Sequence, residues 1–233
     1  MKWTDSGIIL SARPFGENSR ILSLLTPHYG RHAGLIKIPK SRSRLNIEAG
    51  TFVEATWNAR LSDHLGQWAL ETTAAMGAKL LPLPVPLTAL SSACHLTDQC
   101  LPERHPYPYL YELLKQLIED LLHTPDWQIS YVNYELALLK DLGFGLDLSA
   151  CAATGKQDDL IYISPKTGRA VSREAGEAYK AQLLPLPSYW IHEGAMPDIR
   201  TSLTVTGYFL AQHLTERQGL PPIRQRLVDM IEI

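Results

Sequence analysis

The chain has 233 residues, of which 45% are hydrophobic, and its formal net charge at pH 7 is −2. This composition argues against disorder and allows one large domain or two small ones. No apolar run approaches the roughly 18 to 20 residues that span a bilayer, and the first residues, MKWTDSG, contain no apolar signal segment. We therefore expect a cytoplasmic protein without a membrane partner.

Positive charge is concentrated in the amino-terminal part. Residues 1–60 contain nine lysines and arginines against four acidic residues, whereas the rest of the chain contains thirteen against twenty. Such asymmetry points to nucleic-acid binding by the basic part. The three cysteines, Cys94, Cys100 and Cys151, are too few and too scattered for a disulfide framework, so we expect free thiols.

The first eighty residues predict β-structure. Short apolar runs between Gly- and Pro-rich breaks indicate five strands, at about 7–12, 20–27, 32–38, 51–59 and 66–74. The fourth has the clearest period of two, because polar and apolar side chains alternate along it. Five short strands without an intervening long helix predict a closed barrel, with Trp57 and Trp68 in its core.

The proline-rich run at 81–87 is expected to be a linker, because alternate prolines remove backbone donors and disfavour helix before them. It divides the prediction into a barrel at 1–80 and a helical domain at 81–233. Apolar stripes at helical spacing support this division, and the expected helices lie at about 88–100, 110–122, 129–143, 173–183, 203–214 and 222–231. Residues from about 145 to 175 break the pattern and predict an irregular insertion with a small hairpin.

Catalytic motifs fail when tested against their spacing. The run Thr154-Gly155-Lys156 lacks the first glycine and the final Ser or Thr of a phosphate-binding loop. His192-Glu193 lacks the second histidine of a zinc protease, because position 196 is Met196. We therefore expect a protein that is not an enzyme.

Seven basic residues are the candidate DNA contacts, because guanidinium and ammonium groups pair with phosphate and release counterions. They are Arg13, Arg20, Arg31, Lys37, Lys40, Arg42 and Arg44. Residues 37–44 form a basic loop that is equally well explained as a solvated loop. Phe15 and Tyr29 lie in neighbouring turns, where exposed rings can stack on unpaired bases or, alternatively, plug the barrel mouth.

Three stretches, in chain order, resemble the RecO family of bacterial recombination mediators. The first runs from SGIILSARPFGE at 6–17 through SRI at 19–21 to Arg31. The second is LGFGLDLSAC at 142–151, followed by ISPKTGR at 163–169. The third runs from YFL at 208–210 to LPPIR at 220–224. The resemblance therefore spans nearly the whole chain.

This resemblance implies an α+β protein: an oligonucleotide-binding (OB-fold) barrel, then an all-helical domain with an irregular, degenerate zinc-finger-like insertion. It implies binding of single- and double-stranded DNA and annealing of complementary strands. It also implies contact with the acidic, apolar C-terminal tail of the single-stranded-DNA-binding protein and, together with RecR, the loading of RecA. An RNA-binding or scaffolding barrel is an alternative, and a metal-dependent nuclease is a weaker one, since residues 1–60 contain only four carboxylates.

In many members of the family that this chain resembles, the insertion carries two Cys-x-x-Cys pairs that bind a structural zinc. The corresponding positions here are Cys151 and Thr154, then Ser172 and Ala175, so one thiol remains. We therefore expect no zinc and no other cofactor, with Cys151 buried and the insertion held by packing.

The partner tail, by analogy with the family, needs an apolar pocket with cations at its rim. The last helices provide candidates, although cations on helix faces are usually only solvated. These candidates are Arg200, Leu203, Leu210, Arg217 and Arg224.

Overall fold

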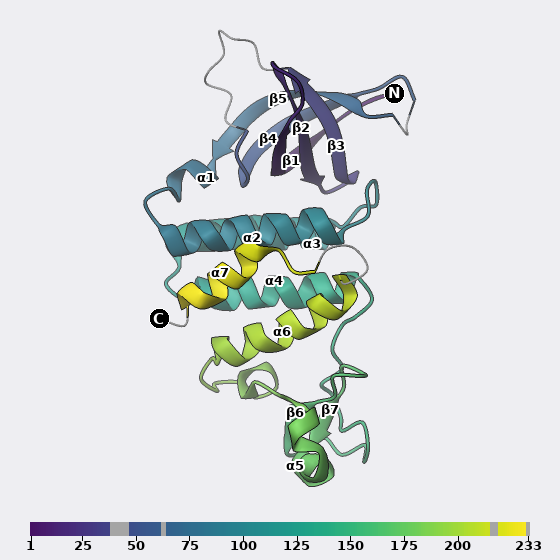
Figure 1. The fold of residues 1–233 in the computed structure, drawn as a ribbon, viewed down its shortest axis with the longest axis vertical. Helices are drawn as coiled ribbons and strands as arrows, with labels where there is room; N and C mark the ends of the chain where they lie inside the picture. The colour runs from purple at the N-terminus through teal and green to yellow at the C-terminus, as the bar shows by residue number, and fades with distance from the viewer. Residues whose placement is uncertain (38–46, 62–63, 215–218, 232–233) are drawn as a thin grey trace. The chain divides into compact units, whose positions relative to one another are not determined.

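The computed structural model describes residues 1–37, 47–61, 64–214 and 219–231, and the chain divides into two compact units, Met1–Trp127 and Gln128–Ile233. A five-stranded barrel lies in the first unit, and helices follow it in the chain (Figure 1). The predicted α+β class, with a barrel first and helices after it, is confirmed.

The barrel contains all five predicted strands. They are β1 (Lys2–Pro14), β2 (Ser19–Thr26), β3 (Gly30–Lys37), β4 (Thr51–Asn58) and β5 (Gly66–Ala75). The strand order is β1-β2-β3-β5-β4, and β1 closes the barrel by pairing with β4 along its first half and with β2 along its second. Strand β1 begins five residues before its predicted start, because residues 2–7 alternate between exposed and buried positions.

Tryptophans fill the barrel core, as predicted. Trp57 is 1% exposed and Trp68 is 5% exposed. Two glycines make room for the rings: a Cβ on Gly66 would lie 2.2 Å from the Trp57 ring, and one on Gly34 would lie 2.6 Å from that of Trp68. These close approaches explain glycine at two positions in strands, where it is otherwise unfavourable.

Three helices complete the first unit: α1 (Met76–Lys79), α2 (Pro84–Cys100) and α3 (Pro108–His123). Helix α2 packs on β1, and α3 packs on α2 and β2. The prediction of a linker at 81–87 is wrong in its second half, because α2 begins at Pro84 and a helix accepts prolines in its first turn. The predicted boundary after residue 80 lies between α1 and α2, whereas the compact units divide after Trp127.

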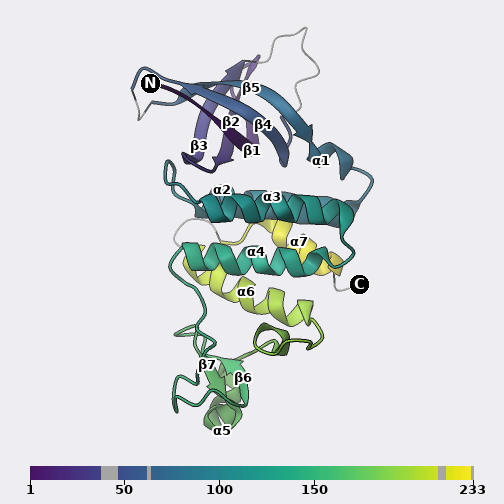
Figure 2. The same ribbon diagram turned by 180° about the vertical axis from the view of Figure 1, so that it is seen from behind.

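The second unit contains α6 (Ile199–Leu214), α7 (Pro222–Ile231) and most of α4 (Trp127–Asp141). Figure 2 shows α4 and α6 side by side. The insertion between them contains β6 (Leu160–Ile163), β7 (Ala170–Ser172) and β8 (Leu184–Pro185) in the sheet order β7-β6-β8, so the predicted hairpin is present. The helix expected at 173–183 is a single α-turn, α5 (Arg173–Gly176), followed by a 3₁₀ helix, η1 (Glu177–Gln182). In the described part of the chain, every helix is too short or too polar to cross a bilayer.

Candidate nucleic-acid interface

Four predicted DNA-contacting residues lie together at one end of the barrel, which we call the basic end: Arg13, Phe15, Arg20 and Lys37. Strand register places them there, because Pro14 pairs with Arg20 and Ser19 pairs with Lys37. Phe15 lies in the turn between β1 and β2, and 52% of its surface is exposed. The basic end therefore combines three cations with one exposed aromatic ring.

The register also assigns these cations to two faces of the sheet. Arg20 lies opposite Ile36, which belongs to the core, so Arg20 is on the inward side at the barrel mouth and is half-buried. Arg13 lies opposite Ile21 and shares the outer face with the exposed Lys37. A phosphate backbone that crosses the barrel rim can therefore meet cations on both sides of the rim.

The cations of the basic end are not bound to acidic side chains in the part of the chain that the structure describes. Among the described residues, Arg13, Arg20 and Lys37 form no ion pair, and Glu17 is the single acidic residue between positions 13 and 37. Lys40, Arg42 and Arg44 lie outside the described residues, and their DNA contacts stay predictions.

Arg31 is separate from this group. Its guanidinium donates from Nε to the Leu101 carbonyl oxygen at 2.7 Å, and its Nη1 lies 3.2 Å from Asp98 Oδ1 and 3.4 Å from Glu103 Oε1. Since the side chain is only 15% exposed, we remove Arg31 from the candidate DNA contacts and assign it to the packing of β3 on the end of α2. No local pattern signals this pairing, because Asp98 lies 67 positions from Arg31.

Tyr29 lies at the opposite end of β2 from the basic end. Its ring stacks on Trp3, with 4.0 Å between the ring centroids and an interplanar angle of 8°. His32 and Trp57 lie beside Trp3 in the same aromatic cluster. Tyr29 and Phe15 therefore do not form one stacking surface, and the barrel-plugging alternative describes Tyr29 better, although 38% of its surface is exposed.

The pocket predicted for the partner tail is not formed by the residues assigned to it. Leu203 is 2% exposed, Leu210 is 0% exposed and Arg224 is 3% exposed, so none of them can line a surface pocket. Arg224 instead binds Glu135 in the interior. Arg200 is exposed, and Arg217 lies outside the described residues.

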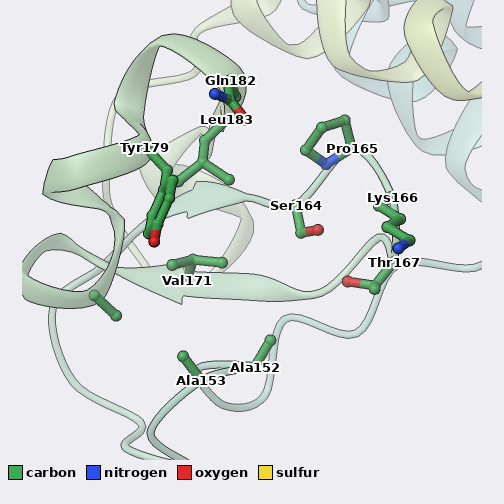
Figure 3. A pocket seen from close by; sticks show the side chains of 11 residues that line it. Ala152, Ala153, Ser164, Pro165, Lys166, Thr167, Val171, Tyr179, Gln182 and Leu183 are labelled. Atoms are coloured by element: carbon green, nitrogen blue, oxygen red, sulfur yellow. The ribbon is translucent and has the colours of Figure 1, made fainter.

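The insertion contains an open groove of about 400 Å³. Figure 3 shows Ala152 and Ala153 below Val171, with Tyr179 and Leu183 above it. Cys151 precedes these alanines and supplies a single thiol, which does not fit the tetrahedral four-cysteine zinc site that the family resemblance implies. Within the described ranges, no group of three or more His, Cys, Asp and Glu side chains is arranged to bind a metal.

Comparison with known proteins agrees with the arrangement of barrel and helices. The family model for the N-terminal part of recombination protein O matches residues 1–73, and the model for its C-terminal part matches residues 84–220. The DNA repair protein RecO of Rhodospirillum centenum is 47% identical over 236 residues, which cover 98% of this chain and 94% of that protein. Its counterpart in Ruegeria is 43% identical and covers 99% of this chain and 98% of its own length. The chain therefore belongs to the RecO family of DNA repair proteins.

Proposed function

We propose that this chain is a non-enzymatic recombination mediator that binds single- and double-stranded DNA at the basic end of its barrel and anneals complementary strands. The observation that carries the proposal is the group of Arg13, Arg20 and Lys37, which lie at one end of three paired strands without ion pairs among the described residues. Because the proposed substrate is chromosomal DNA, we expect the protein in the cytoplasm, associated with the nucleoid.

Annealing requires no catalytic residue. Two DNA strands repel each other through their phosphates, and a cationic surface that neutralises some of these charges lowers the repulsion. Base pairing then supplies the free energy. Phe15 adds an exposed ring on which an unpaired base can stack.

Family membership supports partners in the recombination machinery. We propose contact with RecR, with the C-terminal tail of the single-stranded-DNA-binding protein and, indirectly, with RecA. Because Leu203, Leu210 and Arg224 are buried, Arg200 is the remaining described candidate for the tail. If Arg200→Glu binds a peptide of the tail as tightly as the parent protein, the tail binds elsewhere.

The DNA-binding proposal is tested by anisotropy titrations with labelled single-stranded DNA at several salt concentrations. The triple variant Arg13→Ala, Arg20→Ala, Lys37→Ala should bind more weakly, and the slope of log affinity against log salt should fall by about 2, or roughly 0.7 for each lost phosphate contact. Arg226→Ala removes an exposed cation from α7 and is the matched control. An unchanged slope in the triple variant would exclude the basic end as the DNA site.

An RNA-binding barrel remains the principal alternative, because phosphate contacts and stacking serve RNA and DNA alike. Competition between DNA and RNA of matched sequence distinguishes the two, and a preference for RNA would favour the alternative. Cleavage of labelled DNA in the presence of magnesium or manganese would instead support a nuclease.

A further inference from the structure

Two short segments of the insertion repeat the same spacing. Residues 151–155 read CAATG and residues 172–176 read SREAG. In each segment, the first and fourth positions correspond to a Cys-x-x-Cys pair of the family, and a glycine follows. The first segment is a turn closed by a hydrogen bond from the Gly155 N–H to the Cys151 carbonyl oxygen at 2.9 Å. In the second, Ser172 precedes the single turn of α5.

The Cys151 sulfur joins the two segments. The backbone N–H of Ser172 donates to Cys151 Sγ at 3.3 Å, and the side chain is 1% exposed. The Ser172 hydroxyl is buried as well and makes no well-formed hydrogen bond among the described residues. The buried Cys151 sulfur thus accepts a hydrogen bond from the second segment, and the Ser172 hydroxyl of that segment lies beside it.

These donors also change the acidity of the thiol. Burial alone would raise the pKa of Cys151, but the nearby Ser172 and Thr154 hydroxyls and the N–H groups of Ser172 and Ala153 outweigh it and lower the pKa to about 6. Donors around a sulfur favour its charged form, as they do in thiolate sites that bind metals.

Further contacts join the two segments. The Ala152 N–H donates to the Ala170 carbonyl oxygen at 2.8 Å, which ties the first segment to the start of β7, two residues before Ser172. Ala175 lines the same groove as Ala152 and Ala153. Positions 151, 154, 172 and 175 therefore belong to one compact set of turns.

We propose that the insertion is a metal-independent counterpart of a four-cysteine zinc site built from two turns. In it, Cys151 Sγ links the two turns as a hydrogen-bond acceptor, in place of a metal. The backbone would still fit zinc if cysteines stood at all four positions. The side chains at positions 151, 154, 172 and 175 supply one thiol, two hydroxyls and one methyl group, and this set does not bind zinc as four thiolates do. The proposal does not depend on DNA binding.

Measurements of metal content test whether the insertion folds without zinc and whether its backbone fits zinc. The full-length parent protein should contain no stoichiometric zinc after purification, and its melting temperature should not change with a chelator. The triple variant Thr154→Cys, Ser172→Cys, Ala175→Cys should bind one zinc per chain, with the absorption of a tetrahedral four-sulfur site after cobalt substitution. The same variant with Cys151→Ala retains three of the four thiols and should bind more weakly. One equivalent of zinc in the parent protein, or no gain of binding in a folded triple variant, would overturn the proposal.

Hydrogen exchange tests whether the Cys151 sulfur links the two segments, and it requires no designed metal site. In Cys151→Ala the Ser172 amide should exchange roughly tenfold faster, the factor expected when about 1.4 kcal/mol of protection is lost, while amides of β2 should not change. Cys151→Ser keeps a smaller acceptor, so its Ser172 amide should exchange at a rate between those of the parent and Cys151→Ala. Equal protection in the parent and Cys151→Ala would exclude the sulfur as the link.

Discussion

The Nε atom of Arg224 lies 2.7 Å from Oε1 of Glu135, and both side chains are buried. A second contact, from Nη2 to Oε2 at 2.8 Å, makes the pair bidentate, and the Thr206 hydroxyl donates to the same carboxylate. The pair joins α7 to α4, while Thr206 adds α6. The three helices of the second unit therefore meet at a buried charge pair whose two residues lie far apart in the sequence.

Loss of one partner should be costly. In Arg224→Ala the Glu135 carboxylate stays buried without its counter-ion, so we expect the free energy of unfolding to fall by about 3 to 5 kcal/mol. Urea denaturation measures the loss. Arg226→Ala on the exposed side of α7 is the control and should change little. A loss below about 1 kcal/mol in Arg224→Ala would mean that the pair does not hold the helices together.

Gly207 is predicted to be required for the same pair. A Cβ there would lie 2.6 Å from Arg224 Nη1, so Gly207→Ala should destabilise the protein by about 1 to 3 kcal/mol, although alanine normally stabilises a helix relative to glycine. The cost should shrink when Arg224 is already alanine, because the clash is then gone. Additive losses in the double variant would place the cause elsewhere.

The parts of the fold that depend on local pattern could be predicted from the sequence. Strand periodicity located all five barrel strands, and helical spacing located α3, α4 and α6, because each element buries one face. The start of α2 was missed because prolines were interpreted as breakers, whereas Pro84 occupies a first helical turn.

The candidate site was predicted only in part, because charge in a sequence does not show which cations are already paired. Arg13 and Arg31 look alike in the sequence, yet one is exposed and the other binds Asp98 and Glu103. For the same reason, the sequence does not show that Arg224 is buried, because its partner Glu135 lies 89 positions away.

Arg31 and Arg13 should therefore respond differently to substitution. Arg31→Ala removes the donor to the Leu101 carbonyl oxygen and one donor to Asp98, which still accepts from the Ser11 hydroxyl. The free energy of unfolding should therefore fall by about 1 to 3 kcal/mol, while DNA affinity stays near that of the parent. Arg13→Ala should show the opposite pattern. Urea denaturation and DNA titration of both variants check this, and weak DNA binding by a fully stable Arg31→Ala would return Arg31 to the interface.

We predict that His32 makes the stability of the barrel depend on pH. It is 5% exposed, its ring contacts Trp3, Trp57 and Trp68 edge-on, and neither ring nitrogen makes a well-formed hydrogen bond among the described residues. Burial lowers its pKa from 6.5, and the charges of Arg104 and Arg31 act in the same direction. The Tyr29 backbone and Glu103 oppose them without reversing the shift.

The sign of the pH effect follows from this lowered pKa. Below pH 6.5 the unfolded chain takes up a proton that the folded barrel does not, so the stability due to neutral His32 is complete above pH 6.5 and falls as pH drops toward the lower folded pKa. His32→Phe removes this titration and should flatten the decline by up to about 1.4 kcal/mol per pH unit. Urea denaturation between pH 7.5 and 5 measures the slope, with His95→Gln on exposed α2 surface as the control. If His32→Phe loses stability as steeply as the parent, another group causes the decline, because phenylalanine cannot bind a proton in the aromatic cluster.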